Sequence, residues 1–455
     1  MRSQFYILTI SFLLQTFFSN ASVEYLKVSK DGTTLETESG KHFFWQGETA
    51  WLALQKLSQP DLELYLNNRK QQGFNVLQIC VLHGLNDEDF YHNKALKNEN
   101  LVMPRMTNGN NFKAGDTQYD YWDHLVYLVD ECAKRQMYVA IVPIWGSVLE
   151  KVKPSPGTIR IYMNLLCQKL KKKKNVIWLL GGDICGSEFP EIWIEMAGAI
   201  RTHNAKQLIS FHPLEQTSSA TWFHETDWLS FNMCHSGHKD YGQDPDGYGE
   251  DNWKYVHDAL ALFPQKPFID GEISYEDIPH GLHDTTAVRW TAADIRRYAY
   301  WSVFSGSCGF TYGHNSVMQF YDKEDLGVSS YGARRFWHEC LDSDGANDLH
   351  FLKQLMTNRL SNRQDISEFL PDQGNGYNRI LATKGYDYIL FYTFTGRSIL
   401  LPSIFLTGKG WTARWFNPKN GLKRDAIYEK SEDAYRFVAE WEVANGNDWV
   451  LEITW

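Results

Sequence analysis

Eight short apolar runs that alternate with longer, helix-like segments limit the fold of this chain more than any other feature of its sequence. The runs have the length of buried strands, and the segments between them repeat apolar residues at helical spacing. Strands that alternate with helices favour a parallel sheet, and eight such units close a (β/α)8 TIM barrel. The predicted strands are Phe43 to Gly47, Asn75 to Leu82, Tyr138 to Trp145, Val176 to Gly182, Leu208 to His212, Trp228 to Met233, Pro267 to Gly271 and Cys308 to Tyr312. The predicted helices include Pro60 to Gln72, Tyr119 to Gln136, Gly157 to Lys173, Glu191 to Asn204, Asn252 to Leu262 and Ala292 to Phe304.

A doubly wound open sheet is the alternative fold for the same alternation of elements. Such a sheet usually carries a glycine-rich phosphate-binding loop after its first strand. The segment that follows the first predicted strand, Gly47-Glu-Thr-Ala-Trp51, does not have that composition. We therefore predict an α/β barrel.

Two domains are predicted, over residues 22–360 and 361–455. The first begins with a short hairpin between Ser22 and Lys41, which contains the turn signals Asp31-Gly32 and Ser39-Gly40, and continues as the barrel. Beyond Ser361 the alternation ends, and β-rich segments are separated by Gly, Asn and Asp turns. This second domain is predicted to be a small antiparallel β-sandwich.

The composition indicates a large globular protein that is suited to carbohydrate. Of 455 residues, 43% are hydrophobic and 15% are aromatic, which is enough for a large core. The 17 Trp and 24 Tyr suit a cleft that stacks sugar rings, although packing of a large barrel explains any single Trp equally well. A formal charge of −10 provides no basic surface, so the sequence predicts no nucleic-acid partner.

Residues 1–21 have the organisation of a secretory signal peptide. Arg2 supplies the positive start, Phe5 to Phe18 the apolar region, and Ser19-Asn-Ala21 the small residues that signal peptidase recognises. The apolar stretch is shorter than the ~20 residues of a membrane-spanning helix. We therefore predict export, cleavage near Ala21, no stable membrane insertion, and a periplasmic or secreted protein.

The cysteines and histidines form no metal-binding motif in the sequence. Neither Cys-x-x-Cys nor His-Glu-x-x-His occurs. The seven cysteines are too few and too scattered for a disulfide framework. The sequence therefore predicts neither a metal site nor a cofactor.

Two predicted strands end in a carboxylate, and this pairing is the best indicator of function. Asp183 follows the fourth strand and Glu272 follows the seventh, and the carboxyl ends of barrel strands share one face. Two carboxylates there indicate hydrolysis of a glycosidic bond. We predict a retaining enzyme in which Asp183 is the general acid/base and Glu272 the nucleophile. The reverse assignment, or a helix-capping or arginine-pairing role for either residue alone, remains open.

Other polar and aromatic residues end or follow the predicted strands at the same face. A single His or Asn is more often a hydrogen-bonded structural residue, so the prediction depends on their convergence. Sugar hydroxyl groups need several fixed donors and acceptors beside an aromatic surface. The predicted substrate-binding residues are Glu48, Thr49, Trp51, His83, Trp145, His212, Asn232, His235, His238, Tyr275, Tyr312 and His314.

Taken together, these segments resemble the apiosidase-like family of glycoside hydrolases, in which a (β/α)8 domain precedes a small β-domain labelled as collagen-binding. The resemblance covers nearly all of the chain after the leader. It is carried by Phe44-Trp-Gln-Gly-Glu-Thr-Ala-Trp51, Val176-Ile-Trp-Leu-Leu-Gly-Gly-Asp183, Ser210-Phe-His-Pro213, Phe231-Asn-Met-Cys-His-Ser-Gly-His238, Asp270-Gly-Glu-Ile-Ser-Tyr-Glu276, Arg296-Arg-Tyr-Ala-Tyr-Trp-Ser-Val303, Gly309-Phe-Thr-Tyr-Gly313 and Trp415-Phe-Asn-Pro418.

The resemblance implies an exported glycosidase that acts on plant cell-wall polysaccharide, in particular on apiose-containing side chains of pectin of the rhamnogalacturonan II class. Asp183 and Glu272 fall at the matching catalytic positions. Three residues depart from the family pattern: Glu48 stands where Asp is usual, Ile273 where Pro is common, and His235 where Gln is often found. We expect all three beside the cleft, where they bear on which linkage is cleaved.

The alternative function is that of a glycan-binding or adhesive protein with a catalytically silent barrel. Its contacts would come from exposed aromatic residues of the second domain, among Tyr386, Tyr388, Tyr392, Trp411 and Trp415. Strand propensity explains these aromatics more often than binding does, so we favour a structural role for this domain.

Overall fold

The structure is a computed structural model, and it describes residues 23–107, 118–408 and 410–455. The predicted signal peptide and its cleavage site lie outside the described residues. Within the described ranges, no helix combines the length and the apolar character that a membrane span requires.

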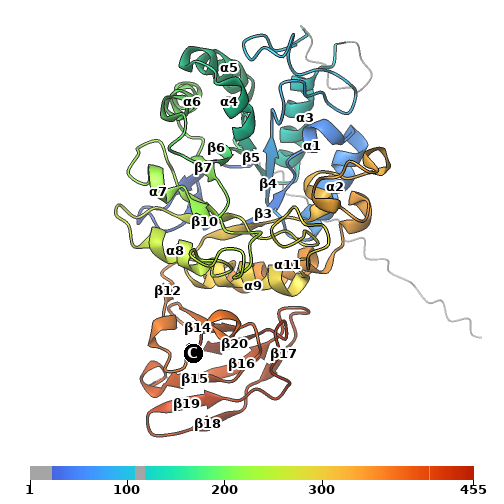
Figure 1. Cartoon of the computed structure of the whole chain (residues 1–455). Coiled ribbons are helices and arrows are strands. Elements are labelled where there is room, and N and C mark those ends of the chain that lie inside the picture. The colour runs from blue at the N-terminus through green and yellow to red at the C-terminus, as the bar shows by residue number, and fades with distance from the viewer. Residues whose placement is uncertain (1–22, 108–117, 409) are drawn as a thin grey trace, which may run out of the picture.

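Eight parallel strands form a barrel, as the sequence predicts (Figure 1). Ladders join β7, β6, β5, β4, β3, β11, β10 and β9 in that order. The Ser230 main-chain N–H, beside β9, donates to the carbonyl of Ile209 in β7 at 2.7 Å and brings the two ends of the sheet together. The barrel strands are β3 (Trp45–Thr49), β4 (Val76–Cys80), β5 (Tyr138–Val142), β6 (Val176–Ile184), β7 (Ile209–Pro213), β9 (Asn232–His235), β10 (Phe268–Glu272) and β11 (Gly309–Tyr312), with β8 (Thr217–Ser218) added antiparallel to β9.

Helices surround the barrel, and all six predicted helices are present. Four of them, α2, α3, α5 and α9, begin at a side-chain cap. For example, the Ser58 side chain accepts from the Asp61 N–H before α2, and Thr291 forms a capping box with Asp294 before α9. The predicted helices are α2 (Gln59–Gln71), α3 (Tyr121–Lys134), α5 (Pro156–Leu170), α6 (Pro190–His203), α8 (Trp253–Leu260) and α9 (Ala292–Phe304). The sequence prediction did not include α1 (Ala53–Lys56), α4 (Gly146–Val152), α7 (Ala220–Phe223), α10 (Asn315–Met318) and α11 (Asp344–Met356).

Antiparallel strands occupy both ends of the described chain. The predicted N-terminal hairpin is formed by β1 (Leu26–Val28) and β2 (Leu35–Thr37). At the C-terminal end, two antiparallel sheets enclose one apolar core to which Phe391, Trp415 and Leu451 belong. One sheet contains β12 (Gln364–Asp365), β13 (Ile380–Lys384), β14 (Tyr388–Thr393), β20 (Trp449–Thr454), β16 (Thr412–Phe416) and β17 (Lys423–Asp425), and the other β15 (Ile399–Pro402), β19 (Ala434–Phe437) and β18 (Tyr428–Lys430).

The aromatic residues considered for ligand contact in this domain are mostly core residues. Tyr388, Tyr392 and Trp415 are 3%, 0% and 0% exposed. Trp411 packs against neighbouring aromatic rings, whereas Tyr386 is 93% exposed. Strand packing therefore accounts for three of the five residues, which agrees with the structural role favoured for this domain and removes these three from the alternative, glycan-binding surface.

Helix α9 joins the barrel to the C-terminal sheets, which lie against it in Figure 1. Arg296 of α9 binds both carboxylate oxygens of Asp448, at 2.8 and 2.7 Å, and one oxygen of Asp348 in α11 at 2.7 Å. All three residues are buried. Beside them, the ring of Tyr300 stacks on that of Tyr392 with a centroid distance of 4.6 Å.

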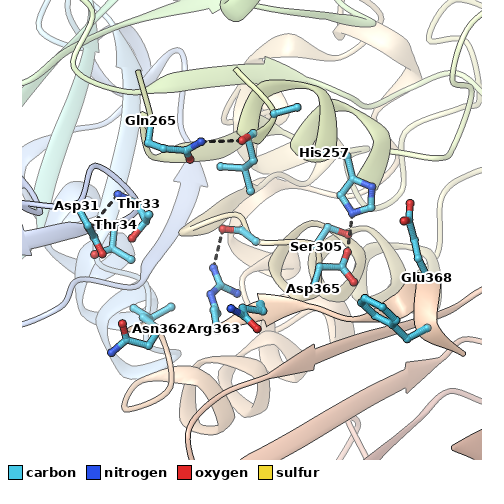
Figure 2. Close-up of a pocket in the computed structure, with 16 residues that line it drawn as sticks. Asp31, Thr33, Thr34, His257, Gln265, Ser305, Asn362, Arg363, Asp365 and Glu368 are labelled. Carbon is cyan, nitrogen blue, oxygen red and sulfur yellow. Dashed lines mark hydrogen bonds and ion pairs between the residues drawn. The ribbon is translucent and has the colours of Figure 1, made fainter. Parts of the chain in front are cut away.

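The barrel and the C-terminal sheets also meet at a second region, which contains a cavity of about 600 Å³ (Figure 2). The Arg363 guanidinium donates to the carbonyls of Val303, in the last turn of α9, and of Gly306 and Ser307 just beyond it. The imidazole of His257 lies 2.5 Å from a carboxylate oxygen of Asp365. Because these side chains already have protein partners, we assign them to holding the connecting segment against the barrel.

We expect Arg296→Met to lower the free energy of unfolding by about 3–5 kcal/mol, because it leaves buried carboxylates without their charge partner. Chemical denaturation of the purified protein measures the change. The matched control is Arg436→Met, because Arg436 pairs with Glu429 at 3.5 Å on the surface, so this substitution should cost about 0–1 kcal/mol. Equal stabilities for the two variants would contradict the role given to Arg296.

Candidate active site

Asp183 is aimed into the barrel mouth by an irregular end of strand β6. Gly181, Gly182 and Asp183 have φ angles of 94°, 97° and 51°, and the pairing of β6 with β7 shifts register between Gly181 and Ile184. A Cβ atom on Gly181 would lie 2.3 Å from the carbonyl oxygen of His212. The positive φ angles and the close approach to His212 therefore explain why this strand end carries glycines.

Glu272 follows a comparable irregularity at the end of β10. The pairing of β10 with β9 shifts register between Asp270 and Glu272. A Cβ atom on the intervening Gly271 would lie 2.4 Å from the side chain of Met233. Asp270 faces away from the cavity, and its carboxylate accepts hydrogen bonds from Ser236, Asn252 and Ser302.

Two imidazole rings bridge the two carboxylates. His235 places Nδ1 3.1 Å from Oδ1 of Asp183 and Nε2 3.5 Å from Oε1 of Glu272. His212 places Nδ1 3.5 Å from the same Asp183 oxygen and Nε2 3.0 Å from Oε2 of Glu272. His238 adds a third contact, with its Nε2 3.1 Å from Oε1 of Glu272.

This arrangement keeps the buried Glu272 side chain ionised. Burial acts to raise the pKa of Glu272, but His235, His212 and His238 outweigh it, and the pKa lies well below its ordinary value. Burial likewise acts to lower the pKa of His235, while Glu272 and Asp183 raise it to about 9. An imidazolium at His235 therefore offsets one of the two negative charges of the carboxylates beside it.

Asp183, His212, His235 and Glu272 could also hold a metal ion. One nitrogen or oxygen atom of each lies within 4.8 Å of the corresponding atoms of the other three. The four residues come from the ends of four different strands, so no short sequence motif marks them. A metal site of this kind therefore leaves no local motif in the sequence.

A cavity of about 350 Å³ opens above the carboxylates. Trp51 and Trp145 meet edge to face on one side, with ring centroids 5.0 Å apart, and the Trp51 indole N–H donates to the Tyr275 hydroxyl at 3.0 Å. The predicted site residues that line this cavity are Trp51, His83, Trp145, Asp183, His235, His238, Glu272 and Tyr275.

Glu48 does not fit the substrate-binding role expected of it. Its carboxylate is fully buried and pairs with the guanidinium of Arg69 in α2 at 3.0 Å. Burial raises the pKa of Glu48 to about 7 although Arg69 opposes the rise. Ile273 is also fully buried and does not line the cavity, so of the three departures from the family pattern only His235 reaches it.

Five more predicted residues are buried away from the cavity surface. His212 touches both carboxylates from below, and Thr49 is likewise fully buried. The other three have protein partners: Asn232 with His224 at 3.0 Å, Tyr312 with Glu276 at 2.7 Å, and His314 with the Ser316 N–H at 3.1 Å. These contacts leave Asn232, Tyr312 and His314 with structural roles, which corrects the prediction that they bind substrate.

The cavity also contains residues that the sequence analysis missed. Tyr331, Glu215 and His283 belong to loops between the barrel elements. Tyr331 has a φ angle of 52° within a short 3-10 turn, Ser330–Gly332. No strand ends near Tyr331 or His283, so the strand-end criterion could not select them.

Comparison with known proteins agrees with both parts of this description. Residues 29–362 match the family model "Apiosidase-like, catalytic domain", and residues 365–454 match "Putative collagen-binding domain of a collagenase". A solved structure titled "Glycoside hydrolase" is 38% identical, with a TM-score of 0.86 over 95% of this chain and 97% of its own. A glycoside hydrolase family 5 structure from Bacteroides vulgatus is also 38% identical, with a TM-score of 0.86 over 94% and 93%. No curated protein matches the chain.

A barrel with two carboxylates at the carboxyl ends of its strands, and close structural relatives of that class, define a glycoside hydrolase. The chain belongs to the apiosidase-like family of glycoside hydrolases. The resemblance seen in the sequence is thereby confirmed, as is the presence of the second, β-rich domain.

We expect Gly181→Ala to reduce glycosidase turnover and to lower stability by about 1–3 kcal/mol, because an alanine at this φ angle is strained and its Cβ meets the main chain of His212. Turnover and thermal denaturation are measured together. Gly198→Ala in α6 is the control, since a Cβ there has open space and alanine favours the helix. Normal turnover by Gly181→Ala would show that the irregular strand end does not position Asp183.

Proposed function

We propose that this enzyme is an exported, retaining glycosidase that cleaves O-glycosidic bonds in plant cell-wall polysaccharide, with apiose-containing side chains of rhamnogalacturonan II as its substrate. The observation that carries the proposal is the separation of the catalytic pair, because oxygen atoms of Asp183 and Glu272 lie within 4.8 Å of each other. Retaining enzymes hold their carboxyl groups roughly 5–5.5 Å apart, whereas inverting enzymes need roughly 6.5–9.5 Å to admit a water molecule.

The surroundings of the two carboxylates support different roles for them. Glu272 is 3% exposed and is held ionised by three imidazoles, as a nucleophile must be. The side chain of Asp183 is 35% exposed at the opening of the site, where a leaving group can reach it. We therefore assign Glu272 as nucleophile and Asp183 as general acid/base.

The reaction follows from these positions. Glu272 attacks the anomeric carbon while Asp183 protonates the departing oxygen, which gives a covalent glycosyl-enzyme. Asp183 then removes a proton from water, and the water oxygen displaces Glu272 from the anomeric carbon. The neutral Tyr275 hydroxyl, whose pKa is raised by burial and by Glu272, stays available as a hydrogen-bond donor beside the nucleophile.

The substrate proposal rests on family membership and on the shape of the site. The cavity of about 350 Å³ is at the small end of ligand pockets, which suits a short side chain better than a long polymer. Its tryptophan and tyrosine rings suit the apolar faces of a sugar, and its imidazoles suit the hydroxyl groups. Export to the periplasm or beyond rests on the leader-like residues 1–21.

We expect Asp183→Asn and Glu272→Gln each to lower turnover of an oligosaccharide by about 1,000-fold or more, because each removes one half of the double displacement. An aryl glycoside with a nitrophenol leaving group separates the two roles, because nitrophenolate leaves without being protonated. With this substrate, Asp183→Asn should still form the glycosyl-enzyme at a substantial rate, whereas Glu272→Gln should not form it. Glu429→Gln, in the exposed β18 strand, is the control. Undiminished turnover by either catalytic variant would end the assignment.

We expect the first-formed sugar to keep the anomeric configuration of the substrate, because two displacements at one carbon restore it. Proton NMR recorded during hydrolysis of a panel of pectic oligosaccharides gives both the anomer and the preferred linkage. Inversion would contradict the retaining mechanism. Hydrolysis of other glycosides but not of apiose-containing ones would contradict the substrate and leave the mechanism intact.

A further inference from the structure

Four side chains of types that ligate metals meet at the mouth of the barrel, one from each of four neighbouring strands. Asp183 comes from β6, His212 from β7, His235 from the end of β9 and Glu272 from β10. One donor atom of each lies within 4.8 Å of the other three. Three of the residues are buried, and Asp183 lies at the open side.

Several of these donor atoms have ion-pair contacts but no hydrogen bond within the described residues. Both ring nitrogens of His212, Nε2 of His235 and Oε2 of Glu272 are buried and lack a hydrogen bond, although each lies 3.0–3.5 Å from an oppositely charged group. The Nε2 of His212 lies 3.0 Å from Oε2 of Glu272, yet the two lack the alignment of a hydrogen bond. Buried polar atoms are normally hydrogen-bonded, so four that are not, gathered in one place, indicate that the site receives a ligand.

The donor set selects the kind of ligand. Two imidazole nitrogens and two carboxylate oxygens match Zn²⁺ and its neighbours among the transition metals, whereas Ca²⁺ and Mg²⁺ prefer oxygen donors alone. His238 also fits this assignment, because it contacts Glu272 at 3.1 Å and can orient that carboxylate from outside the cluster.

We propose that Asp183, His212, His235 and Glu272 bind one divalent transition-metal ion of the Zn²⁺ class, and that the bound ion competes with glycoside hydrolysis. Tetrahedral Zn²⁺ holds its donors about 3.3 Å apart, so the cluster contracts on binding. Asp183 can make this movement because its side chain is 35% exposed. Hydrolysis stops because the ion occupies the carboxylates that the proposed function uses as acid/base and nucleophile.

Metal binding is tested on untagged enzyme without substrate, by calorimetric titration with Zn²⁺ alone and by the visible absorption of Co²⁺. We expect one ion per chain and an affinity that falls about 100-fold or more in His212→Gln and in His235→Gln, since loss of even an outer partner costs 10–100-fold. The control is His203→Gln, at the end of α6, where affinity should not change. Zn²⁺ should raise the melting temperature of the wild type and of the control, but not of the two cluster variants. The same melting curves show whether the cluster variants are folded.

The competition is tested by adding Zn²⁺ to a turnover assay and then removing it with a chelator. We expect Zn²⁺ to inhibit turnover. A higher substrate concentration should relieve the inhibition, and a chelator should reverse it. Absence of stoichiometric binding, or equal affinity in folded His212→Gln and His235→Gln, would overturn the metal site and leave the glycosidase proposal standing. Loss of activity on chelation, with recovery on adding Zn²⁺, would contradict the proposal that the ion competes with hydrolysis. An enzyme that binds Zn²⁺ but cleaves no glycoside would instead contradict the proposed function.

Discussion

The active site depends on charge compensation between two carboxylates and the imidazoles that bridge them. A buried carboxylate without a partner is strongly destabilising, and Glu272 is 3% exposed. His212 and His235 each contact both Glu272 and Asp183, so the same two rings stabilise the charge and set the distance between the acids. Loss of either ring would disturb the charge state and the geometry together, and with them the chemistry.

The backbone places these charges by departing from regular strand geometry at two points. Three successive residues with positive φ angles, ending at Asp183, interrupt the pairing of β6 with β7, and a register shift at Gly271 precedes Glu272. Regular strands would send alternate side chains into the barrel interior and the helix layer. The irregular ends re-aim the two carboxylates towards one cavity, so local strain in the backbone is linked directly to the function of the site.

The sequence predicted most of the fold and the two carboxylates that the structure brings to one cavity, because both leave local patterns. Apolar runs between amphipathic segments mark barrel strands, and an acidic residue that ends such a run is easy to recognise. The sequence did not predict the direction in which the neighbouring side chains point. Glu48 also lies at a strand end, yet it turns towards Arg69 in the helix layer, and Tyr331 reaches the cavity from a loop with no periodic signal. Side-chain direction and loop position depend on tertiary contacts, which spacing in one sequence does not encode.

The central claim is that Glu272 attacks the sugar and becomes covalently attached to it. A 2-deoxy-2-fluoro glycoside with a good leaving group slows the second step and lets the intermediate accumulate, so peptide mapping by mass spectrometry can locate the attached sugar. The account predicts one sugar per chain, on the peptide that contains Glu272. A sugar on Asp183, or steady turnover with no attached sugar under conditions that trap other retaining enzymes, would contradict it.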